Sequence, residues 1–199
     1  MLEPDQQTMT SMATVARARA RSWHLFGEVV STPTPDFVAR LRDGRFRDEV
    51  AETSSWLGDG SPFATHLSTL QAFVTRSKRF PLEHDLTSLR DEWTRLFGEP
   101  DASGQTELGV RFTAAAESCE AEAEAWERGD HASAKQHRLD QFRTLTDELE
   151  PMVAWCRTLE HETRVLVGKV LARLVAAHLS AESGRDLVTG VMSPAEPRA

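Results

Sequence analysis

Five glutamates crowd one predicted helix and form the densest group of ionisable side chains in the chain: Glu117, Glu120, Glu122, Glu124 and Glu127. All except Glu122 are spaced three or four residues apart, which places those four on one face of a helix. Their mutual repulsion must be offset by solvent or by a cationic partner. Two interpretations follow. The face is solvated, as on many acidic proteins, or it is a docking strip for a basic peptide, because carboxylates bind guanidinium groups in bidentate geometry.

Histidine and serine offer no comparable arrangement. No histidine pair has the i, i+4 spacing with an intervening glutamate that zinc hydrolase helices use. His178 lies on an apolar helix face, where we expect a core histidine with a satisfied hydrogen bond. The chain has no glycine-rich phosphate loop and no Gly-x-Ser-x-Gly elbow. We therefore expect no metal site, no cofactor and no enzyme activity, although a missing motif does not exclude an enzyme.

Each of the five tryptophans lies near the apolar stripe of a predicted helix: Trp23, Trp56, Trp93, Trp126 and Trp155. Burial in the core is the simplest interpretation for all of them. Trp23 and Trp93 are also candidates for lining a groove.

The elements that must position these residues are helices. The chain has 199 residues, a net charge of −8 and neither isoleucine nor asparagine, so it lacks one strong strand former and the Asn-Gly hairpin signal. We predict an all-α, single-domain bundle of about eight helices over residues 10–182. Residues 1–9 are expected to be a flexible N-terminus and residues 183–199 a frayed tail. An acidic chain does not suit binding to nucleic acid.

Local signals mark several helix ends. Thr34 and Pro35 have the cap-plus-proline pattern of a helix start, and Gly44 is expected to end the helix that follows. Gly98 is expected to end another helix, the segment 98–109 is the most loop-like interior stretch, and a helix is predicted from about Thr106 to Arg128. Apolar periodicity predicts the first helix at about residues 10–29, with five apolar residues on or near one face: Met12, Val15, Trp23, Phe26 and Val30.

Localisation signals are absent from the sequence. The segment 165–179 is apolar but is interrupted by charged residues, so we expect no membrane insertion. The spaced arginines at positions 17, 19 and 21 do not form a twin-arginine export signal. Cys119 and Cys156 lack metal-binding spacing and are expected to be buried, reduced thiols of a cytoplasmic protein.

Four segments, in order, resemble the TorD/DmsD family of redox-enzyme maturation chaperones, with NarJ as a more distant relative. Residues 89–100, LRDEWTRLFGEP, are similar to the family signature L-x-x-E-Y-T-R-L-F-x-G-P, with Trp93 where tyrosine is usual. Residues 16–44 are similar to the family's opening, and Trp23 again replaces a tyrosine. Residues 128–153 and 166–179 resemble two later motifs. The resemblance covers about residues 13–182.

The chain departs from the family after Pro100. Only residues 101–109 separate this proline from the next helix, and the family's Asp-His loop, which is implicated in client binding, has no counterpart. The residues of that loop therefore cannot be carried over. The shortened connection leaves an altered groove or a relative with a different client.

The resemblance implies a cytoplasmic chaperone, monomeric or homodimeric, without enzyme activity. It would bind the twin-arginine signal peptide or N-terminal region of a molybdopterin-containing oxidoreductase before cofactor insertion and export. An apolar groove would use Trp23, Trp93, Leu96 and Phe97, and the client's arginines would bind Glu120, Glu124 and Glu127. The alternatives are an all-helical assembly factor without signal-peptide binding, and a small-ligand-binding helical protein or enzyme.

Overall fold

The computed structural model describes residues 6–53, 90–91, 93–95, 98–143, 145, 178–179 and 182. Within these ranges most residues are helical and no strand occurs, in agreement with the all-α prediction. The predicted helices between residues 54 and 89, most of the apolar helix near residues 165–179 and the expected C-terminal tail lie outside the described residues. None of the described helices is long and apolar enough to cross a membrane.

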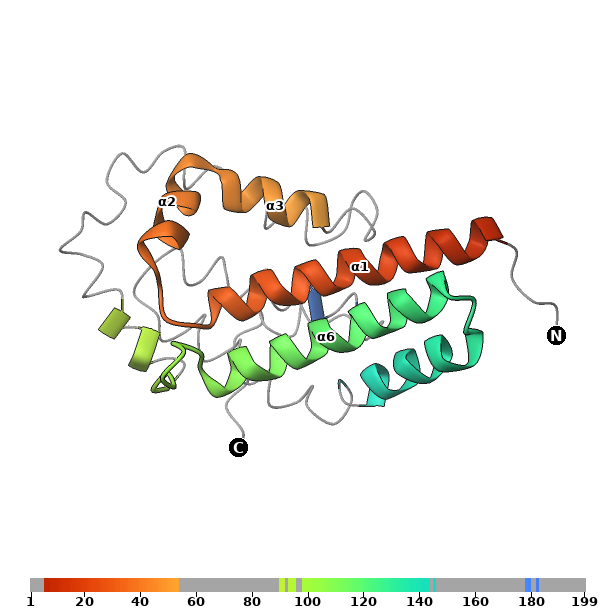
Figure 1. Ribbon diagram of the computed structural model, residues 1–199. Helices are drawn as coiled ribbons and strands as arrows, with labels where there is room; N and C mark the ends of the chain where they lie inside the picture. The colour runs from red at the N-terminus through yellow and green to blue at the C-terminus, as the bar shows by residue number, and fades with distance from the viewer. Residues whose placement is uncertain are drawn as a thin grey trace, which may run out of the picture.

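Two long helices, α1 (Gln6–Val29) and α6 (Glu107–Glu127), run antiparallel and side by side (Figure 1). Helix α1 begins four residues earlier than the predicted start, so residues 6–9 are helical. Helix α6 has the predicted bounds. Its N-cap is Thr106, whose hydroxyl accepts a hydrogen bond from the Gly109 backbone N–H at 3.1 Å.

Small residues line the contact between α1 and α6: Ala13, Ala16, Ala20 and Gly27 from α1 and Gly109, Ala116, Cys119 and Ala123 from α6. The two backbones are close at Gly27, where an added Cβ would lie 3.5 Å from the Phe112 Cβ. The buried face of α1 therefore includes its alanines as well as larger side chains. Of the five apolar residues predicted on one face, Trp23, Phe26 and Val30 are buried, whereas Met12 and Val15 are 41% and 37% exposed.

Two short helices, α2 (Pro35–Asp43) and α3 (Arg45–Thr53), follow α1. The Thr34 cap and the left-handed Gly44, with a φ of 85°, confirm the predicted boundaries of α2. Arg40 of α2 pairs with Glu28 of α1 and with Glu49 of α3, and so ties the three helices together.

The loop before α6 is fastened to the end of α1. The Thr32 backbone N–H donates to the Gly104 carbonyl at 3.1 Å, and the Thr106 hydroxyl donates to the Val30 carbonyl at 2.9 Å. Gly98 has a φ of 86° and its N–H donates to the Thr94 carbonyl, as predicted for a helix end. The short connection therefore fixes where α6 begins relative to α1.

A further helical segment, residues 131–143, turns back along α6 after Gly129 and Asp130 (Figure 1). Asp130 caps it by accepting the Ser133 N–H at 3.0 Å. Ala134 packs against Ala13 and Trp126, which brings the segment against both long helices. Leu139 and Phe142 on this segment are 51% and 47% exposed.

Candidate functional site

Two arginines of α1 reach opposite edges of α6. Arg17 and Arg19 are two residues apart, so their side chains leave the helix about 200° from one another. Arg17 pairs with Glu120 and Glu127, whereas Arg19 pairs with Glu122 and, beyond α6, with Glu182. The contact between α1 and α6 therefore has an ion-pair cluster along each side, one exposed and one buried.

The exposed cluster, which we call the Arg17 triad, consists of Arg17, Glu120 and Glu127. The guanidinium binds Glu127 in bidentate geometry, with Nε–Oε1 and Nη2–Oε2 distances of 3.2 and 2.8 Å. Its Nη1 donates to Glu120 Oε2 at 2.9 Å. The three side chains are between 36% and 50% exposed. The hydrogen bond that Arg17 donates to Glu127 raises the pKa of Arg17.

The structure separates the residues that the sequence groups into one peptide site. Glu120 and Glu127 belong to the Arg17 triad, and Glu124 pairs with Arg128 at 3.3 Å. Trp93 is 2% exposed and its Nε1 donates to the Val29 carbonyl at 2.7 Å, so it lies in the core near the end of α1. Val29 is twelve residues from Arg17, about 18 Å along the helix.

Three other residues were predicted to line the groove: Trp23, Leu96 and Phe97. Trp23 is 4% exposed and lines a cavity on the edge of α6 opposite to the Arg17 triad. Leu96 and Phe97 lie outside the described residues.

The buried cluster, which we call the Arg19 network, joins five side chains: Arg19, Glu122, Arg138, Gln141 and Glu182. Arg19 binds Glu182 in bidentate geometry at 2.7 and 2.8 Å. Its Nη1 donates to Glu122 at 2.9 Å and its Nη2 to the Gln141 amide oxygen at 2.6 Å. Arg138 Nη1 adds a bond to Glu182 at 3.1 Å. Arg19, Glu122 and Glu182 are each at most 5% exposed.

Burial sets the electrostatics of this network. Burial disfavours the charged form of Arg19 and by itself lowers the pKa. The attraction of Glu182 and Glu122 for the guanidinium is larger, so the pKa of Arg19 is raised. Burial also raises the pKa of Glu182, against the pull of Arg19. The neighbouring Cys119 is a buried free thiol, as predicted, and burial raises its pKa to about 12. That cysteine stays protonated at neutral pH and is a poor nucleophile. Cys156 lies outside the described residues.

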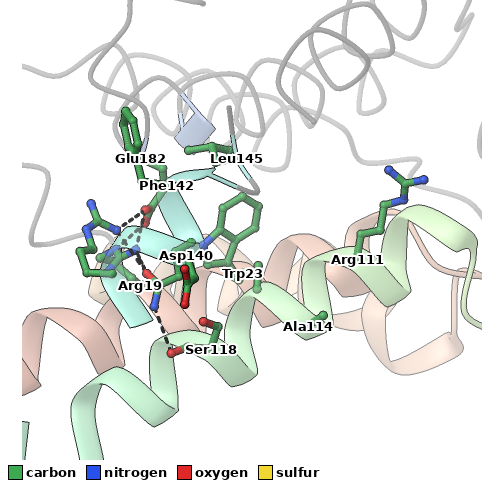
Figure 2. A pocket seen from close by; sticks show the side chains of 12 residues that line it. Arg19, Trp23, Arg111, Ala114, Ser118, Asp140, Phe142, Leu145 and Glu182 are labelled. Carbon is green, nitrogen blue, oxygen red and sulfur yellow. Dashed lines mark hydrogen bonds and ion pairs between the residues drawn. The ribbon is translucent and has the colours of Figure 1, made fainter. Parts of the chain in front are cut away.

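A cavity of about 240 Å³ adjoins the Arg19 network. The described residues that line it come from α1, α6, the segment 131–145 and position 182: Arg19, Trp23, Arg111, Ala114, Ala115, Ser118, Arg138, Asp140, Gln141, Phe142, Leu145 and Glu182. In Figure 2, Arg19 and Glu182 lie at one end, Arg111 at the other, and Trp23 between them. Arg111 and Ser118 are seven residues apart on α6, about 10 Å along its axis.

His178 is fully buried beside the cavity wall. Its ring contacts Trp23 edge-to-face at 4.4 Å between centroids and Phe26 at 4.9 Å. Burial, with a smaller contribution from Arg19, lowers its pKa to about 3. His178 is therefore a neutral histidine, and its burial agrees with the expectation of a core position. In the described part of the chain, no three histidine, cysteine or carboxylate side chains gather as a metal site would require.

Sequence reasoning missed the Arg19 network, although two of its members carry a signal. Arg19 lies within the stripe of Ala16, Ala20 and Trp23, where a charged side chain must find a buried partner. Glu122 is the glutamate that leaves the spacing of the other four and instead follows Cys119 by three residues. Glu182 carries no comparable signal, because its pairing depends on a segment 163 residues away from Arg19.

Comparisons of the chain with protein-family models, with curated proteins and with solved structures find no match.

Proposed function

We propose that this chain is a cytoplasmic maturation chaperone that binds the arginine-bearing N-terminal segment of a molybdopterin-containing oxidoreductase before cofactor insertion. The observation that carries the proposal is that Glu120 and Glu127 both bind the guanidinium of Arg17 at a half-exposed edge of α6. Such a pair of carboxylates has the geometry to accept an arginine from another chain. The ordered resemblance of four segments to the TorD/DmsD family supports the class of client.

Calorimetry with a synthetic signal peptide tests this function directly. The probe is the synthetic twin-arginine signal peptide of a molybdopterin-containing oxidoreductase. We expect saturable heat and an affinity that falls as salt is raised, because the arginine contacts lie near solvent. Glu120→Lys combined with Glu127→Lys is expected to weaken binding at least tenfold. The matched control, Glu52→Lys with Glu107→Lys, changes the charge equally at two exposed sites outside the strip.

Two outcomes contradict this proposal. If the wild-type protein gives no heat with the peptide, the client assignment is wrong. If peptide binding survives both lysine substitutions in the strip and does not depend on salt, the carboxylate strip is not the arginine site.

Arg17 occupies the carboxylates that a client arginine would use, so its removal is expected to strengthen peptide binding. Exposed ion pairs contribute up to about 1 kcal/mol each, and two of them compete with the client. We expect Arg17→Gln to raise the peptide affinity about three- to tenfold. Arg45→Gln removes an equal charge from another exposed pair and is expected to leave the affinity within twofold. Weaker binding by Arg17→Gln would mean that Arg17 organises the peptide site.

A further inference from the structure

We propose that the cavity beside the Arg19 network binds a small aromatic carboxylate, with its ring against Trp23 and its carboxylate on Arg138. This inference does not rest on the chaperone proposal, because the cavity and the Arg17 triad lie on opposite edges of α6.

The size of the cavity fits a single ring with a short arm. An apolar cavity of about 150 Å³ holds benzene, which has six non-hydrogen atoms. By proportion, the 240 Å³ here accommodates a ligand of about ten such atoms. That is the size of a phenyl ring with a two- or three-carbon acid.

The wall between the two ends is apolar and is kept open by small residues. Ala114 and Ala115 of α6 line the cavity together with Trp23 of α1, and Leu145 adds a buried aliphatic surface. Phe142 lines the cavity while 47% exposed, so it borders both the interior and the solvent. A flat ring seated here gains contacts with an aromatic face and loses its own apolar surface to water.

Arg138 supplies the anion-binding end. Its Nη1 is held by Glu182 Oε2 at 3.1 Å and by Gln141 Oε1 at 3.4 Å. Glu182 is itself fixed by the bidentate contact with Arg19. Arg138 Nε and Nη2 make no hydrogen bond within the described residues, and its side chain is 40% exposed. A guanidinium fixed in this way offers two parallel donors to a carboxylate at little entropic cost.

The charges on the cavity wall also favour an anion. Three guanidinium groups line it, from Arg19, Arg111 and Arg138, against two carboxylates, from Asp140 and Glu182. Asp140 already accepts hydrogen bonds from Gln136 and Arg143. Among the described lining residues the balance is positive, in a chain whose net charge is −8. Two of the three guanidinium groups also pair with carboxylates that are not among the lining residues, Arg111 with Glu107 and Arg19 with Glu122, so Arg138 is the guanidinium to which we assign the anion.

Calorimetry with 3-phenylpropionate tests the site. We expect one site per chain with a dissociation constant below about 1 mM. The neutral analogue 3-phenylpropan-1-ol is expected to bind at least tenfold more weakly, because it cannot pair with Arg138. Absence of saturable binding up to ten times that concentration would overturn the proposal, and so would equal affinity for the alcohol.

Two substitutions, each with a matched control, locate the ligand. Ala115→Leu places a larger side chain on the apolar wall and is expected to weaken 3-phenylpropionate binding at least tenfold. Its control, Ala132→Leu, changes an exposed helical alanine outside the cavity and is expected to change the affinity less than twofold.

Arg138→Gln is expected to weaken binding at least tenfold and to make the affinities for the acid and the alcohol equal. Arg111→Gln, at the far end, is expected to change it less than threefold. A larger effect at Arg111 than at Arg138, or none at Ala115, would overturn the assignment. Circular dichroism confirms that each variant is folded.

Discussion

Replacing Arg19 with methionine is expected to lower the free energy of unfolding by about 3–5 kcal/mol, as removing one partner of a buried ion pair does. The substitution keeps most of the apolar stem but removes the hydrogen bonds that Arg19 donates to Glu122, Glu182 and the Gln141 amide oxygen. Two carboxylates then stay buried, and Arg138 pairs with one of them, Glu182. Urea denaturation followed by tryptophan fluorescence measures the loss.

Arg17→Met is the matched control, because it makes the same change two residues earlier on the same helix. The Arg17 triad is between 36% and 50% exposed, so its loss is expected to cost no more than about 1 kcal/mol. Adding Glu182→Gln to Arg19→Met is expected to restore part of the lost stability, because it removes an unpaired buried charge. Equal losses for the two arginine variants would contradict the assignment of Arg19 as the buried anchor.

Helix boundaries were the part of the fold that the sequence predicted well. Caps act through neighbouring residues, so Thr34, Gly44, Gly98 and Thr106 could be assigned from local chemistry, and the structure confirms all four. The buried face of α1 was predicted in part. Periodicity of large residues correctly assigned Trp23, Phe26 and Val30 to the core, but it also favoured Met12 and Val15, which are exposed, and it passed over the buried alanines. Close approach of two helices depends on small side chains, which hydrophobic patterns underweight.

In the candidate sites, too, the sequence predicted what depends on one helix and missed contacts between residues far apart in the chain. Spacing on one helix predicted that Glu120, Glu124 and Glu127 share a face, and the first and last of these do converge on one guanidinium. It did not show that the guanidinium belongs to Arg17, because that contact joins residues 110 positions apart. The Arg19 network spans 163 positions and was missed for the same reason.

The positions of Arg17 and Arg19 give α1 two separate tasks. Arg17 lies at a half-exposed edge, where its ion pairs are weak enough to exchange with a competing cation. Arg19 lies in the interior, where its ion pairs hold position 182 and the segment 131–143 in place. Exchange at one edge therefore need not disturb the packing at the other.

Acidification is expected to destabilise the protein through His178. Burial lowers the pKa of this histidine to about 3 in the folded state, whereas the unfolded chain titrates near 6.5. Between these values the unfolded state binds the additional proton, so stability falls as the pH drops below about 6.5. At pH 5 the loss from this one group is about 2 kcal/mol relative to pH 7.5. Urea denaturation at the two pH values measures it.

His178→Phe isolates this contribution, because phenylalanine keeps a ring against Trp23 and Phe26 but cannot take up a proton. The pKa of Glu182 is raised in the folded state, so above its ordinary pKa this group makes stability rise as the pH falls, opposite to His178. Glu182 is present in both proteins, so the difference between the wild type and His178→Phe reports on the histidine. We expect the variant to lose about 2 kcal/mol less than the wild type between pH 7.5 and pH 5. His24→Phe, at an exposed position of α1, is expected to lose as much as the wild type. If His178→Phe and the wild type lose equal stability, His178 takes up its proton in the folded state, and the enclosure of its ring by Trp23 and Phe26 does not exclude the charge.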